Sequence, residues 1–164
     1  LSEMHPEFVV YAKAVLFDLW DQKQASVTLN STYRTVAKQR EFWDKHQAWI
    51  AGGRVGRQPY AAAPAQPGYS KHNLGTAIDF NPTVGGTVLG SRNTGTTKQQ
   101  WLNSGIPEII AANGLVWGGN WNNYDPIHMH LEVNDTVRLA IINASGDITS
   151  KTEAVSAIAT VSLT

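Results

Sequence analysis

The segment Ser70-Lys71-His72-Asn73-Leu74-Gly75-Thr76-Ala77-Ile78-Asp79 restricts the fold and the chemistry of this chain more than any other. It places an imidazole and a carboxylate seven residues apart, with Gly75 between them. Because glycine adopts backbone conformations that turn a loop into a strand, we expect His72 in a loop and Asp79 on a buried strand over residues 76–80. Both side chains could then reach one metal ion at about 2.0–2.2 Å.

The setting of Asp79 favours a positively charged partner. Its neighbours in the chain, Ile78 and Phe80, are both apolar. An unpaired carboxylate in such surroundings costs several kcal/mol or becomes protonated. A bound cation would remove that cost, and pairing with an arginine or with backbone amides is the structural alternative.

A second motif, Asp125-Pro126-Ile127-His128, follows about fifty residues later, at the start of a strand expected over Ile127 to Val133. His128 would supply a third ligand, and Asp125 would act as the general base toward a metal-bound water. Because alternate residues of a strand share a face, His130 points to the same side as His128. The spacing leaves both as ligand candidates, and the other would support the ligand or bind substrate.

The composition bounds the other classes of function. The length of 164 residues fits one domain, and a net charge of zero gives no sign of a nucleic-acid or membrane surface. The absence of cysteine excludes a thiolate metal site and leaves the redox compartment open. No run approaches the ~18 apolar residues of a membrane span, and no signal peptide is visible. Since the chain starts at Leu1, we expect it to be processed or cut from a longer protein.

The order of expected elements predicts an α+β fold with a small antiparallel sheet flanked by helices. Apolar periodicity and capping residues predict helices over residues 6–22, 35–50, 97–103 and 107–114. Strands are expected over residues 26–30, 76–80, 115–117 and 127–133, with loops or hairpins over 52–70 and 81–96. Residues 1–145 would form one domain, and residues 146–164 would form a C-terminal tail or an edge segment.

Two further groups of residues are candidates for the site. In Trp117-Gly118-Gly119-Asn120-Trp121, two glycines between two indoles allow a close approach, which gives either a pocket wall or a packed turn. Arg34 is a candidate anion clamp, with Gln39 five residues later, although a solvated arginine is the simpler interpretation. The six tryptophans of the chain could fill the core or line a groove that stacks on sugar or peptide.

Taken in order, these motifs resemble the M15 peptidase family, which contains zinc D-Ala-D-Ala carboxypeptidases, L-alanyl-D-glutamate endopeptidases and many phage endolysins. The matching patterns are Ser-x-His-x-x-Gly-x-Ala-x-Asp at Ser70–Asp79, Trp-Gly-Gly-x-Trp at Trp117–Trp121 and acid-x-x-His at Asp125–His128. A fourth, Tyr-Arg-Thr-x-x-x-Gln, lies at Tyr33–Gln39. The resemblance covers residues 26–132.

The resemblance implies a zinc site at the sheet, with His72, Asp79 and His128 as ligands and Asp125 as the base. It selects His128 over His130, and it implies that Arg34 holds the substrate or the developing oxyanion. Substrate contacts are expected from Ser70, Gln39, Trp117 and His130.

The implied substrate is the peptide stem of bacterial peptidoglycan, cut by a monomeric enzyme that acts on the cell wall outside the cytoplasm. An aspartate in the base position with Trp-Gly-Gly-x-Trp looks like the endopeptidases that cut between L-Ala and D-Glu, of the lytic endolysin type. Pro126 after the acid looks like the D-alanyl-D-alanine carboxypeptidases, which are the alternative. A non-catalytic wall-binding or virion module is a further alternative. A glycan-cleaving enzyme needs a spaced pair of carboxylates, for which the sequence gives no support.

Overall fold

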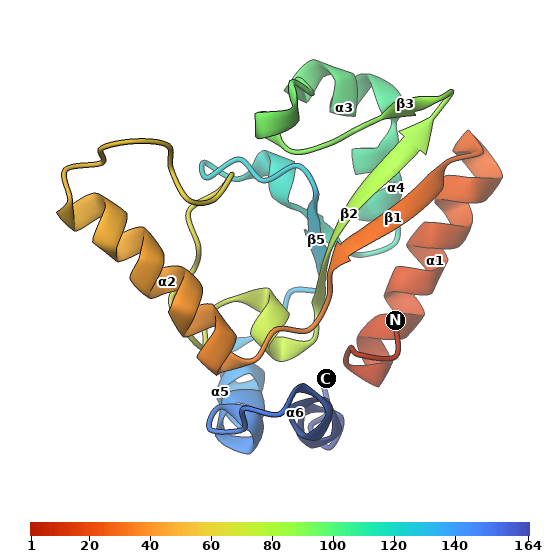
Figure 1. The fold of residues 1–164 in the computed structure, drawn as a ribbon. Helices are drawn as coiled ribbons and strands as arrows, with labels where there is room; N and C mark the ends of the chain where they lie inside the picture. Colours follow the sequence, from red (N-terminus) through yellow and green to blue (C-terminus); the bar gives the residue numbers. More distant parts are fainter.

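Five antiparallel strands form the centre of the fold in the computed structural model, which describes residues 1–164 (Figure 1). The strand order is β1-β2-β5-β4, and β3 pairs with the outer end of β2 as a hairpin. The strands are β1 (Ser26–Ser31), β2 (Ala77–Val84), β3 (Thr87–Val88), β4 (Val116–Trp117) and β5 (His128–His130). The predicted α+β class with a small antiparallel sheet is therefore confirmed.

Six α-helices and three short 3₁₀ helices surround this sheet. The α-helices are α1 (Pro6–Lys23), α2 (Val36–Ala51), α3 (Lys98–Ser104), α4 (Ile106–Ala112), α5 (Asp135–Ser145) and α6 (Lys151–Ile158). The 3₁₀ helices are η1 (Lys71–Leu74), η2 (Arg92–Thr94) and η3 (Gly118–Asn120). Helices α1, α3 and α4 lie on one side of the sheet, whereas α2 extends away on the other side and α5 and α6 lie below it (Figure 1). None of the helices has the length and apolar character that a membrane span requires.

The capping residues explain where the predicted helices begin. The Thr35 side chain accepts a hydrogen bond from the Lys38 amide at the start of α2, and Thr97 forms a capping box with Gln100 at the start of α3. Pro107 occupies the first turn of α4, where its missing N–H has no cost. The helices predicted from periodicity are therefore confirmed to within a few residues.

Two apolar clusters hold the fold together. The larger one packs α1, α3 and α4 against the sheet, and its largest fully buried side chains are those of Trp101, Phe8, Phe80 and Leu19. The smaller one lies under η1 and joins α5 to α6 through Leu74, Val137, Ile141, Ala154 and Ile158. Residues next to Asp79 and His128 belong to the larger cluster, and Leu74, two residues after His72, belongs to the smaller one.

The C-terminal segment differs from the expectation of a tail or an edge strand. Its residues 151–158 form helix α6, which buries Ala154 and Ile158, and the preceding helix α5 was not predicted. The sequence does contain N-terminal capping residues for both helices. The Asn134 side chain accepts a hydrogen bond from the Val137 amide, and the Ser150 side chain accepts one from the Glu153 amide. The helices were not predicted because this region has few charged residues and many β-branched residues, which have a low helix propensity.

Gly75 ends η1 and turns the chain into β2, as the sequence predicted. Its φ of +69° lies in the left-handed region, and a Cβ atom there would come within 2.4 Å of Ile158 Cδ1 and 2.8 Å of the His5 backbone nitrogen. Glycine is therefore required both for its conformation and for the close approach of α6 and the N-terminus.

We expect Gly75→Ala to lower the free energy of unfolding by about 3 kcal/mol, which combines left-handed strain with overpacking. Gly86→Ala is the matched control, because Gly86 has a φ of +79° with nothing within 4 Å of the added Cβ. Its expected cost is only about 1 kcal/mol. Urea unfolding measures both values, and equal costs would show that the close approach around Gly75 contributes nothing.

Candidate active site

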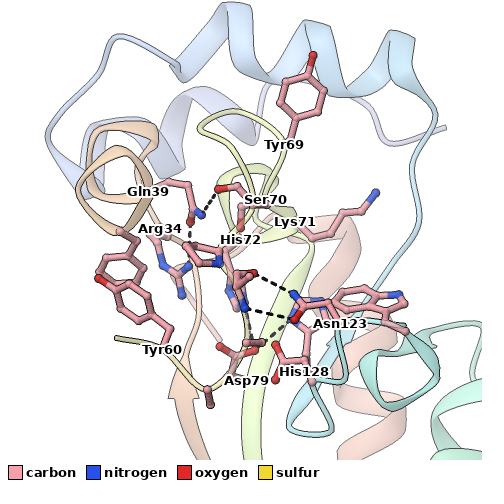
Figure 2. Close-up of a pocket in the computed structure, with 18 of the residues that line it drawn as sticks. Arg34, Gln39, Tyr60, Tyr69, Ser70, Lys71, His72, Asp79, Asn123 and His128 are labelled. Carbon is pink, nitrogen blue, oxygen red and sulfur yellow. Dashed lines mark hydrogen bonds and ion pairs between the residues drawn. The ribbon is translucent and has the colours of Figure 1, made fainter. Parts of the chain in front are cut away.

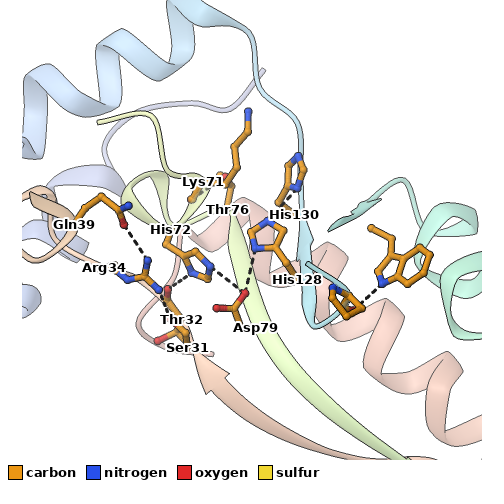
Figure 3. Close-up of polar contacts among 12 residues, drawn as sticks. Ser31, Thr32, Arg34, Gln39, Lys71, His72, Thr76, Asp79, His128 and His130 are labelled. Atoms are coloured by element: carbon orange, nitrogen blue, oxygen red, sulfur yellow. Dashed lines mark hydrogen bonds and ion pairs between the residues drawn. The ribbon is translucent and has the colours of Figure 1, made fainter. Parts of the chain in front are cut away.

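The structure brings His72, Asp79 and His128 together from three different elements (Figure 2). Asp79 on β2 and His128 on β5 are direct cross-strand partners, and His72 lies on η1, just before β2. Asp79 Oδ1 is 3.2 Å from His72 Nε2 and 3.1 Å from His128 Nδ1 (Figure 3). The three donor atoms lie within 4.8 Å of one another, which makes this group a candidate metal site.

The donor atoms fit a zinc ion in spacing and in chemistry. Tetrahedral zinc with bonds of about 2.0–2.1 Å places neighbouring ligand atoms about 3.3 Å apart, close to the separations of Asp79 Oδ1 from the two imidazoles. The Thr32 carbonyl lies 2.7 Å from His72 Nδ1 and can only accept, so that nitrogen carries the proton. In the neutral ring, the lone pair on His72 Nε2 therefore faces the Asp79 carboxylate. Two such electron-rich groups in contact favour a cation between them.

The protonation states of these groups suit ligands. Burial alone would raise the pKa of Asp79, but the adjacent His72 and His128 hold that pKa well below its usual range. Burial lowers the pKa of His128 to about 4, so its imidazole is neutral at pH 7. An ionised carboxylate and a neutral imidazole are the forms that bind a metal.

Asp125 faces the same cleft with a free carboxylate. Its hydrogen bonds use only backbone atoms, with its amide donating to Gly118 and its carbonyl accepting from His128. Burial, followed by the negative charge of Asp79, raises the pKa of Asp125 to about 6. A carboxylate with a pKa near neutrality is suited to accept and return a proton, although a bound cation would lower this value.

A packed turn lies before Asp125 and supports the backbone at that residue. Trp117 Nε1 donates to the Pro126 carbonyl at 2.7 Å, and a Cβ at Gly119 would lie 2.1 Å from the Trp117 ring. A Cβ at Gly118 would lie 2.5 Å from the Asp125 carbonyl oxygen. Because Gly118 and Gly119 have no side chains, the Trp117 ring and the Asp125 backbone can pack closely against this turn.

Arg34 presents its charge to the cleft without a carboxylate partner. Its guanidinium donates to Gln39 Oε1 at 2.9 Å and to Ser31 Oγ at 3.1 Å, and it lies 4.6 Å from the centre of the Phe42 ring. It forms no ion pair. Burial lowers the pKa of Arg34, while the charges of Asp79 and Asp125 oppose this shift. Neutral partners hold the cation in place and leave its charge available to an anion.

The cleft around these groups has a volume of about 860 Å³. Seven of the nine predicted site residues line it: Arg34, Gln39, Ser70, His72, Asp79, Asp125 and His128. The other two, for which substrate contacts were expected, are buried outside the lining: Trp117 is 3% exposed and His130 is 1% exposed. Trp117 supports the Asp125 loop, and His130 lies behind His128.

Sequence reasoning missed several residues of the cleft wall. These residues are Phe42, Tyr60 and Tyr69. Trp121, one of the two indoles for which a pocket wall was an expected role, also lines the cleft, and its ring centre lies 4.7 Å from that of His128. Asn123 joins the two sides of the wall, because its side chain accepts from the Ala63 amide and donates to the Ala63 carbonyl. For Tyr60 and Tyr69, the available signal was the aromatic content of the loop over residues 52–70.

Asp125→Asn should stabilise the metal-free protein by about 1–2 kcal/mol at pH 7.5, after allowance for its partial exposure. Because the pKa of Asp125 is higher in the folded protein than in the unfolded chain, the folded protein binds this proton more tightly. The free energy of unfolding of the wild type therefore falls as the pH rises from about 4 to about 6. Asparagine removes this loss. Urea unfolding of both proteins with chelator, at pH 7.5 and at pH 4, measures the effect. The difference should vanish at pH 4, and a destabilised variant at pH 7.5 would contradict the assignment.

A comparison with protein families gives one match. The M15 peptidase family model described as D-alanyl-D-alanine carboxypeptidase matches residues 64–132, which contain the three donor residues and Asp125. No curated protein sequence matches significantly.

Three solved structures are similar to this chain at low sequence identity. A variant of the vancomycin-resistance D,D-pentapeptidase VanY in complex with Zn(II) aligns with a TM-score of 0.53 and 22% identity, over 85% of this chain and 78% of that chain. VanYB with D-alanine-D-alanine gives a TM-score of 0.49 and 19% identity, over 84% and 76%. The Serratia marcescens L-Ala D-Glu endopeptidase ChiX gives 0.47 and 18%, over 79% and 80%. Residues 64–132 of this chain are therefore similar to the M15 peptidase family, and the chain shares its fold with the VanY peptidase.

Proposed function

We propose that this protein is a zinc-dependent peptidase that hydrolyses the peptide stem of bacterial peptidoglycan. The observation that carries the proposal is the convergence of three kinds of group on one cleft: three metal donors, a free carboxylate of raised pKa and an arginine without an ion pair. The family match supports a peptidase, and the VanY comparison supports the fold.

His72, Asp79 and His128 would hold the zinc. When bound, zinc acts as a Lewis acid that lowers the pKa of a coordinated water toward about 7 and polarises the scissile carbonyl. Three protein ligands are the number typical of catalytic zinc sites, which keep a position open for water or substrate.

Asp125 and Arg34 would carry the other parts of the reaction. Asp125 accepts the proton of the attacking water and returns it to the leaving amine. Arg34 stabilises the negative charge that develops on the carbonyl oxygen, or holds a carboxylate of the stem peptide. Ser70 and Gln39, in the same wall, supply polar contacts for the substrate.

For the scissile bond, we favour L-Ala–D-Glu and a lytic enzyme of the endolysin type that acts on the cell wall. The sequence features that support this choice are the aspartate in the base position and the Trp117–Trp121 motif. The second candidate is a D-alanyl-D-alanine carboxypeptidase, which the description of the family model favours. A non-catalytic wall-binding module is less well supported, because it would have no need of the free carboxylate of Asp125.

Mass analysis of peptidoglycan digested by the purified, zinc-loaded protein tests this proposal. We expect products with a new amino terminus on D-Glu, no free D-alanine and no new reducing sugars. Free D-alanine would instead identify the carboxypeptidase, and an unchanged cell wall would indicate the non-catalytic module. A chelator should abolish product formation, because no other group in the cleft can polarise the carbonyl as strongly.

Two variants serve as controls in the same assay. Asp125→Asn should keep stoichiometric zinc but lower kcat by about 10²–10⁴-fold, the typical contribution of a positioned base. His72→Ala should lose both zinc and activity. Full zinc occupancy together with normal activity in His72→Ala would contradict the metal site.

A further inference from the structure

A row of charged and polar side chains lies behind the His128 imidazole, on the side away from Asp79. His128 Nε2 is 3.2 Å from His130 Nδ1, and His130 Nε2 is 2.9 Å from Glu132 Oε2 (Figure 3 shows the two histidines). The other oxygen of Glu132 accepts a hydrogen bond from Lys71 at 2.5 Å. His130 is 1% exposed, whereas the Glu132 side chain is 59% exposed, so the outer end of this row reaches solvent.

The direction of the hydrogen bonds in this row follows from its outer end. A carboxylate can only accept, so His130 Nε2 donates to Glu132. In a neutral His130 ring, Nδ1 then has a free lone pair and accepts the proton on His128 Nε2. The lone pair of a neutral His128 is therefore on Nδ1, the nitrogen that faces Asp79.

We propose that His130 is a positioning residue that, with Glu132, sets the tautomer and the orientation of the His128 ligand. This inference rests on the zinc site of the proposed function. The other ligand imidazole has the same kind of support, since the Thr32 carbonyl accepts from His72 Nδ1. Each imidazole thus directs one lone pair toward the site because its opposite nitrogen has an acceptor. Such supporting hydrogen bonds orient metal ligands and strengthen their binding.

Packing holds this row in place from two directions. The Trp121 ring centre lies 4.7 Å from that of His128 and 5.3 Å from that of His130, so one indole covers both imidazoles. The ion pair between Lys71 and Glu132 joins two parts of the chain. Lys71 lies on η1 together with His72, and Glu132 lies just after β5, the strand that carries His128. The supporting row therefore also connects two of the three segments that supply metal donors.

Zinc affinity, measured by titration against a chelator of known affinity, tests this role. His130→Phe keeps a ring but removes the acceptor, and we expect it to weaken zinc binding by about 10–100-fold. His130→Asn places an amide oxygen near the Nδ1 position and should remain within a few-fold of the wild type. Asp135→Asn breaks an exposed ion pair with Arg138 elsewhere on the surface and should leave the affinity unchanged.

The nitrogen chemical shifts of His128 in the metal-free protein give a second, independent readout. The wild type should show the proton on Nε2, and His130→Phe should show a mixture of the two tautomers. If His130→Phe does not fold, Glu132→Ala replaces it, because the Glu132 side chain is 59% exposed and its loss leaves no buried gap. This variant should weaken zinc binding several-fold.

Each outcome bears on one claim. A folded His130→Phe that binds zinc within twofold of the wild type and keeps the proton of His128 on Nε2 would overturn the positioning role alone. A wild-type protein that binds no zinc would instead contradict the proposed function. A stability loss in His130→Phe with unchanged zinc affinity and tautomer would show a purely structural histidine, which also overturns the proposal.

Discussion

The ionised carboxylate of Asp79, placed between the imidazoles of His72 and His128, is the interaction on which the site depends. Its side chain is 16% exposed, in a strand whose neighbouring residues are buried. Such a charge is costly unless it is paired, and its closest partners are nitrogen atoms that can themselves bind a cation. A zinc ion would be held by all three side chains, which only the folded chain brings together. Metal binding and the stability of the central sheet should therefore be coupled.

The remaining parts of the site are arranged around this carboxylate by short segments. The segment after β1 contributes two groups to the site. The Thr32 carbonyl accepts a hydrogen bond from His72 Nδ1, and the Arg34 guanidinium places a positive charge in the cleft. The Trp117–Trp121 segment also makes two contacts. Trp117 donates a hydrogen bond to the Pro126 carbonyl next to Asp125, and the Trp121 ring packs against the His128 ring. Strands β2 and β5 supply Asp79 and His128, η1 supplies His72, and the connecting segments supply Arg34 and Asp125.

Much of this could be predicted from the sequence, where local rules determine the structure. Caps and periodicity located most helices, and the positions of His72, Asp79 and His128 relative to Gly75 and the strands predicted which side chains meet. Helices α5 and α6 were missed because their apolar faces become evident only when they pack under η1. Trp117 and His130 are both buried by the folded chain, so they do not line the cleft. The spacing of residues in the sequence does not determine which of these side chains becomes buried.

Anomalous X-ray diffraction at the zinc edge, from crystals grown with one equivalent of zinc, would locate a zinc ion bound to Asp79 directly. We predict a single strong peak bonded to His72 Nε2, Asp79 and His128 Nδ1, at about 2.0–2.2 Å from each. The peak should have at least one further position open toward the cleft. A peak bonded to His130 and Glu132, or the absence of any peak near Asp79, would contradict the account.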